Sequence, residues 1–74
     1  MNLKENIIRW PKHFRPIPAP FYVVTCGDHC MVCMLTDEGD LIGEVSAIHW
    51  NRYIVRTWAL NFAMNAELNK QMED

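Results

Sequence analysis

The sequence predicts an α+β domain in which a three-stranded antiparallel sheet packs against one long C-terminal helix. Residues 46–72 carry apolar side chains at helical spacing and contain no proline or glycine. Residues 21–45 contain three short runs rich in β-branched and aromatic residues, separated by two glycine-containing turns. With 74 residues, the chain has the length of one small domain, 1–74.

The long helix is predicted from one broad apolar stripe. At about 100° per residue, the residues that share this stripe are Ile54, Val55, Trp58, Ala59, Phe62 and Ala66. We expect Trp58 and Phe62 to be buried between the helix and the sheet. Two residues are candidate N-caps, Ser46 and Asn51, because each has a side-chain oxygen that can accept a first-turn amide. We predict a helix over residues 46–72; a start at Asn51 would instead let the third strand run on to residue 50.

The sheet is predicted as a meander of strands Phe21–Cys26, His29–Thr36 and Leu41–Val45, with a glycine at positive φ in each turn. Pairing the ends of the first hairpin assigns every side chain to one of two apolar faces. We expect the long helix to cover the face of Tyr22, Val24, Met31, Cys33, Leu35, Leu41 and Val45. The opposite face then needs the N-terminal segment or a second protein as cover; it carries Phe21, Val23, Val32, Met34 and Ile42.

Residues 1–20 are predicted to form a short helix followed by an extended proline-rich arm. Asn2 is a candidate cap, Glu5 completes a capping box, and Pro11 ends a helix over Met1–Trp10. The alternating prolines of residues 16–20 hold the backbone extended. We interpret this arm as a stiff connector, and its alternative role is as a ligand for an aromatic groove on another protein.

Composition and charge narrow the class of protein. Half of the residues are hydrophobic, but no apolar run approaches the roughly 20 residues of a membrane-spanning helix, so we expect no membrane partner. The N-terminus has no apolar signal core, and three cysteines are too few and odd in number for a closed disulfide framework. These features indicate a cytoplasmic protein, because thiols stay reduced there.

Cys26, His29 and Cys33 are weak candidates for a metal site, with Cys30 between them. Thiolate and imidazole ligands suit zinc, which requires four ligands around a tetrahedron. Side chains alternate along a strand, so the predicted hairpin turns Cys30 away from the other two thiols. We therefore expect cysteines that pack as small hydrophobic residues, and a fold that forms without zinc or any other cofactor.

Five basic residues are weak candidates for nucleic-acid binding: Arg9, Lys12, Arg15, Arg52 and Arg56. The arginines of the helix lie one turn apart and could meet phosphates. The net charge of −2 is unlike that of a basic nucleic-acid-binding domain, so a solvated polar edge is the favoured interpretation. No phosphate loop, nucleophile elbow or paired-carboxylate motif is present, and we expect a non-enzymatic protein.

A second apolar stripe on the helix predicts an interface. Tyr53, Leu60 and Met64 lie roughly opposite the core stripe, and Ile7 and Trp10 add apolar surface from the N-terminal segment. Scattered surface hydrophobic residues are the ordinary alternative. We interpret the stripe as the contact face for a protein partner or a homodimer, in a role like that of small bacterial accessory proteins or phage-encoded modulators.

Overall fold

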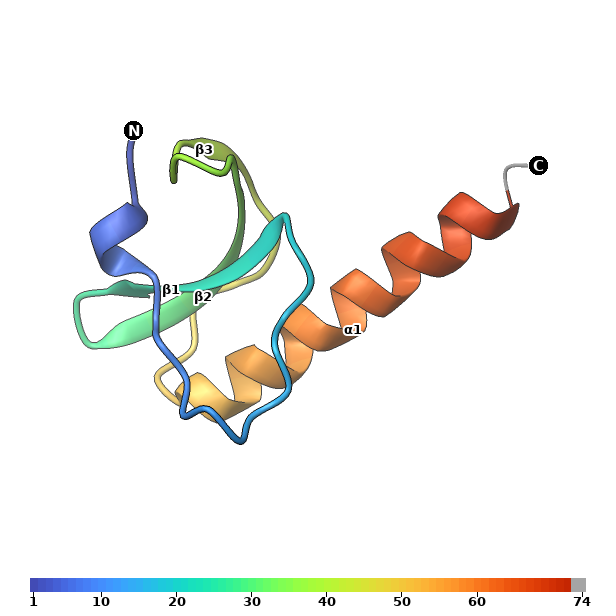
Figure 1. The fold of residues 1–74 in the computed structure, drawn as a ribbon. Coiled ribbons are helices and arrows are strands. Elements are labelled where there is room, and N and C mark those ends of the chain that lie inside the picture. The colour runs from blue at the N-terminus through green and yellow to red at the C-terminus, as the bar shows by residue number, and fades with distance from the viewer. Residues whose placement is uncertain (73–74) are drawn as a thin grey trace.

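The computed structural model describes residues 1–72 and confirms the α+β class. The elements in chain order are the 3-10 turn η1 (Lys4–Asn6), the strands β1 (Phe21–Cys26), β2 (His29–Leu35) and β3 (Leu41–Glu44), and the helix α1 (Arg52–Met72). The strands form one sheet in the order β1-β2-β3, and α1 lies across one of its faces (Figure 1). Residues 73 and 74, the end of the predicted domain, lie outside the described residues.

The first hairpin has the predicted register. Cys26 pairs with His29 and Tyr22 pairs with Cys33 across β1 and β2. The turn glycines, Gly27 and Gly39, have φ values of 65° and 92°, in the region that glycine adopts without steric cost. Both turns were predictable because this requirement is local to a few residues.

Gly39→Ala is expected to destabilise the fold by about 2 kcal/mol. A methyl group at position 39 would lie 2.7 Å from Cβ of Lys4, and the positive φ adds strain of its own. Gly43→Ala is the matched control, because a methyl group there has nothing within 4 Å. Urea denaturation of both variants measures the difference, and equal losses would contradict the close approach of the two segments.

The predicted helix over Met1–Trp10 is wrong, since only the three residues of η1 are helical. The backbone of this segment bonds to the sheet instead. The amide of Leu3 donates to the carbonyl of Gly39 at 2.8 Å, and the amide of Ile8 donates to the carbonyl of Val23 at 2.9 Å. A helix of about ten residues is too short to be stable alone, so these long-range hydrogen bonds prevail.

The helix covers the face opposite to the predicted one. The buried residues between α1 and the sheet, here called the helix-side core, are Ile8, Phe21, Val23, Cys30, Val32, Val55, Ala59 and Ala63. A β-bulge explains part of the error: Met34 pairs with Gly43 and Leu35 with Leu41, which leaves Ile42 without a partner in β2. Strict alternation therefore fails in β3, and Val45 packs with the helix-side core.

The N-terminal segment covers the face that the prediction gave to the helix. Its side chains Leu3 and Ile7 pack on a second core of the buried residues Val24, Cys33 and Leu35. Partly buried residues complete this core; they are Tyr22, Met31 and Leu41. Both apolar faces of the sheet are therefore covered within one chain, and neither needs a second protein as its cover.

The helix begins at Arg52 with Asn51 as its cap, and the start at Ser46 is wrong. The side-chain oxygen of Asn51 accepts the amides of Tyr53 at 2.9 Å and Ile54 at 3.4 Å. The hydroxyl of Ser46 instead accepts the amide of Val32 at 2.9 Å, so it holds the connection between β3 and α1 against the sheet.

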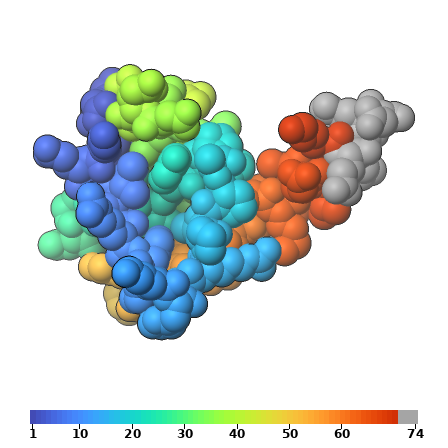
Figure 2. Space-filling model, viewed as in Figure 1, coloured from blue at the N-terminus to red at the C-terminus, as the bar shows by residue number. Residues whose placement is uncertain are grey.

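The C-terminal half of α1 extends beyond the sheet. A helix of 21 residues spans about 32 Å, whereas the seven residues of β2 span about 24 Å. Residues 64–70 are accordingly all exposed, and this part of the helix projects from the body of the molecule (Figure 2). Among the described residues, no helix is both long enough and apolar enough to cross a membrane.

The predicted core stripe of α1 is only partly correct. Val55 and Ala59 are fully buried, whereas Trp58 and Phe62 are partly buried and pack against the helix-side core. The remaining members of the stripe, Ile54 and Ala66, are exposed. The small side chain of Ala59 lets the helix approach the sheet closely, which places the larger aromatic residues beside the contact.

Candidate interaction surface

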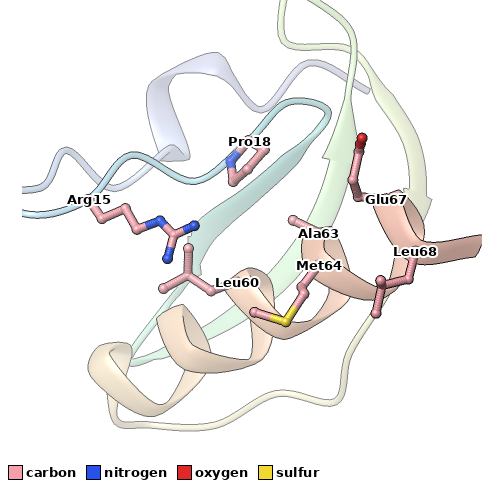
Figure 3. A pocket seen from close by; sticks show the side chains of 7 residues that line it. All are labelled: Arg15, Pro18, Leu60, Ala63, Met64, Glu67 and Leu68. Carbon is pink, nitrogen blue, oxygen red and sulfur yellow. The ribbon is translucent and has the colours of Figure 1, made fainter. Parts of the chain in front are cut away.

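A groove of about 350 Å³ lies between the projecting part of α1 and the arm that precedes β1. Its lining residues are Arg15, Pro18, Leu60, Ala63, Met64, Glu67 and Leu68. The arm supplies Arg15 and Pro18, and the helix supplies the others (Figure 3). We call this feature the α1 groove.

Three apolar side chains run along the α1 groove. Leu60, Met64 and Leu68 are spaced four residues apart and so lie on one side of the helix. Leu60 is partly buried, whereas Met64 is 54% exposed and Leu68 is 50% exposed. Two of these residues belong to the predicted interface stripe. Leu68 was missed, although its spacing from Met64 equals that of Met64 from Leu60.

The α1 groove has a positive end and a negative end. Arg15 extends from the arm toward Leu60, and Glu67 lies at the other end of the groove, where its side chain points away from that of Leu68 (Figure 3). Seven residues of helix, about 10 Å, separate Leu60 from Glu67. The two charges therefore flank the apolar stripe instead of neutralising each other at one point.

The arm is fixed to the helix by Arg56, which lies among aromatic rings. Its guanidinium carbon is 5.5 Å from the ring centre of Trp10 and 5.0 Å from that of Phe14. Tyr53 completes the cluster, at 5.9 Å from Trp10 and 6.2 Å from Phe14. The guanidinium also donates a hydrogen bond to the backbone carbonyl of Arg15. We call this set of contacts the Arg56 clamp; it holds the arm wall of the α1 groove over the helix.

The structure divides the predicted interface residues among three places. Leu60 and Met64 line the α1 groove. Tyr53 and Trp10 contact each other in the Arg56 clamp, although Tyr53 remains 58% exposed. Ile7 packs on the second core against the sheet. Only the first pair therefore lies together along the α1 groove.

The predicted basic residues are also separated by role. Arg56 is partly buried in its clamp and Arg15 lines the α1 groove, so the structure brings these two together through the arm. Arg9, Lys12 and Arg52 are exposed. A guanidinium that stacks on two rings is less available to a phosphate, and the nucleic-acid hypothesis stays a prediction that depends on the exposed cations.

The hairpin register separates the thiols as predicted. Cys30 is buried in the helix-side core, Cys33 is buried in the second core, and Cys26 and His29 are exposed at the hairpin end. Within residues 1–72, no group of three or more His, Cys, Asp or Glu side chains is placed to hold a metal ion. Burial, with smaller effects from Glu44 and Cys26, raises the pKa of the Cys33 thiol above its ordinary value.

The raised pKa of Cys33 predicts a loss of stability in alkaline solution. The folded state keeps the thiol protonated to a higher pH than the unfolded chain, whose thiol ionises near pH 9.0. The stabilisation is therefore complete below about pH 9 and is lost as pH rises through the pKa of the folded state. Urea denaturation from pH 8 to pH 10 measures this slope. Cys33→Ala should remove this slope, whereas Cys26→Ala should keep most of it, because burial is the main cause of the raised pKa of Cys33. Equal slopes in the two variants would contradict the assignment.

Comparisons of the chain with protein-family models, with curated proteins and with solved structures gave no match. Fold alone does not determine function, because one architecture supports many unrelated activities.

Proposed function

We propose that the chain is a non-enzymatic interaction protein that binds another protein chain through the α1 groove. The observation that carries the proposal is the exposure of Met64 and Leu68 on a part of α1 that has no sheet beneath it. Leaving such a stripe in water costs free energy that a protein partner would recover. The two faces of the sheet are covered by the chain's own segments, whereas this stripe borders a groove that a partner can enter.

The shape and chemistry of the α1 groove favour a helix as its occupant. The apolar stripe runs for about two turns along one helix face, which is the geometry of helix-in-groove recognition. Its polar groups are one arginine and one glutamate at the ends, an arrangement that orients a partner. A nucleic-acid surface would instead present several cations along the same path.

The thiols support the placement of this activity in the cytoplasm. All three cysteines are free, two of them buried in the separate cores and one exposed. An exposed free thiol is compatible with a reducing compartment, where disulfide exchange is suppressed. By analogy with small bacterial accessory proteins and phage-encoded modulators, the chain would act by occupying a surface on its partner, without catalysis.

The proposal is tested by two double variants of α1. The substituted positions of the second variant are each one residue further along the helix than those of the first. Met64→Asp/Leu68→Asp places charges on the α1 groove, whereas Asn65→Asp/Asn69→Asp places the same charges on exposed positions outside it. We expect the first variant to lose association and the second to retain it, because a buried unpaired carboxylate opposes binding. Both should keep the helical circular dichroism of the parent.

Association is measured in the native host with a photo-crosslinking residue at position 60, followed by denaturing electrophoresis. The parent and the Asn65/Asn69 variant should give the same crosslinked species, whether its second member is another protein or a second copy. The Met64/Leu68 variant should give none. A parent without crosslinked species, or two variants that behave alike, would refute the proposal.

A further inference from the structure

We infer that the partner at the α1 groove is a second copy of this chain. The two copies pack through the same surface, with their α1 helices related by a two-fold axis at Met64. The inference rests on the proposed function, because it requires the same surface to bind protein. It adds the identity of the partner, the antiparallel orientation of the two helices and the point at which they cross.

The order of the apolar side chains is the first reason. Leu60 and Leu68 are the same residue type and lie four residues before and after Met64. When two copies of α1 pack antiparallel about Met64, Leu60 meets the partner's Leu68 and Met64 meets the partner's Met64. A two-fold interface requires a surface that is complementary to itself, and this stripe meets that condition.

The charges supply an independent reason. Arg15 lies at the Leu60 end of the α1 groove and Glu67 lies at the Leu68 end (Figure 3). The two-fold axis that joins the leucines also brings Arg15 of each copy to the partner's Glu67, which gives two ion pairs. A parallel arrangement would set like charges against each other. The α1 groove is therefore complementary in charge to itself only in the antiparallel orientation.

The position of the stripe leaves room for a second helix. The first half of α1 packs against the sheet and the arm, whereas residues 64–70 are all exposed. This part of the helix projects from the body of the molecule (Figure 2). Antiparallel helices pack with axes about 8–10 Å apart, so side chains from each can enter spaces on the other. The cavity of about 350 Å³ between the arm and α1 can receive apolar side chains of the second copy.

Charge reversal distinguishes a second copy from any other partner. Arg15→Glu and Glu67→Arg should each weaken dimerisation by about tenfold, because the two-fold axis applies every change twice. The double variant Arg15→Glu/Glu67→Arg exchanges both ends and should return dimerisation to within about twofold of the parent. A heterologous partner carries its own unchanged charges, so it could not restore binding to the double variant. Sedimentation velocity over a range of protein concentration measures the constants.

A cysteine at the proposed axis tests the geometry directly. In a Cys26→Ser background, Met64→Cys should form a disulfide between two copies under mild oxidation. The two-fold axis places position 64 of one copy beside position 64 of the other. Asn65→Cys, one residue along the helix, should remain monomeric on a non-reducing gel. Equal crosslinking at both positions would overturn the proposed axis.

The outcomes separate this inference from the proposed function. A parent that stays monomeric, or a double charge variant that stays as weak as the single ones, overturns the self-association. If such a monomeric parent still gives a crosslink to a different protein through position 60, the proposed function stands and only the inference fails. If the chain forms no crosslink with any protein, both fail.

Discussion

Leu35→Ala is expected to leave a large fraction of the protein unfolded at room temperature. Leu35 is 2% exposed and is the largest of the fully buried side chains. Truncation of such a leucine costs about 2–5 kcal/mol, through lost burial and the cavity that remains. A domain of this size has a total stability on the order of 5 kcal/mol, so the loss is comparable to the whole.

Ile42→Ala is the control for this experiment. Ile42 lies in the neighbouring strand β3 but is 57% exposed, so its truncation should change the unfolding free energy by no more than about 0.5 kcal/mol. Circular dichroism during urea denaturation measures both variants. If Leu35→Ala unfolds at the urea concentration of the parent, the N-terminal segment does not seal the second core. The face of the sheet beneath Leu3 and Ile7 would then compete with the α1 groove as the site of association.

The strands and turns were predictable because their signals are short in range. Each turn contains a glycine that the structure places at positive φ, and alternation along β1 and β2 needs only the register at the first turn. The same alternation correctly predicted that the thiols of Cys30 and Cys33 lie on opposite faces of the sheet. The class of the fold follows from these hairpins and the uninterrupted helix.

The choice of sheet face could not be read from alternation alone. The β-bulge opposite Met34 and Leu35 leaves Ile42 without a partner in β2. One extra residue moves every later side chain of the strand to the opposite face of the sheet. The predicted helix of the N-terminal segment was wrong for a related reason, because long-range contacts decide its structure. The amide of Lys4 donates to the side-chain oxygen of Asn2 at 3.0 Å, but Leu3 is the cap residue of η1 and has no side-chain cap, so the predicted capping box is wrong. Pairing with distant sheet residues outweighs one turn of helix.

The candidate site was half predictable. Leu60 and Met64 were identified because apolar residues recur on a side of the helix away from its core stripe, a pattern that sequence shows directly. Tyr53 shares that pattern, but it contacts Trp10 and Phe14, and no local spacing reveals a contact between segments about forty residues apart. Arg15 was noticed only as a positive charge, because its place in the α1 groove depends on how the arm folds back over α1.

Arg56→Ala is expected to destabilise the fold by about 2–3 kcal/mol and to loosen the arm. The change removes the stacking of the guanidinium on Trp10 and Phe14 and its hydrogen bond to the carbonyl of Arg15. The Nε of Arg56 has no hydrogen-bond partner within the described residues, so the side chain acts through its planar face and its terminal nitrogen. Arg56→Lys keeps the charge but lacks the planar fork, and we expect it to recover less than half of the loss.

Arg52→Ala is the control, because Arg52 lies one turn earlier on the same helix and is exposed. Its removal should change the unfolding free energy by only a few tenths of a kcal/mol, with a small gain from removing a cation at the helix N-terminus. The clamp also predicts a functional effect of Arg56 at a distance. Without it, the arm no longer holds Arg15 beside Leu60, so Arg56→Ala should weaken the proposed dimerisation while α1 stays folded, by less than Arg15→Glu does because no repulsive charge is added. Sedimentation velocity and circular dichroism on the same samples separate the two effects, and unchanged dimerisation would show that Arg56 contributes to stability alone.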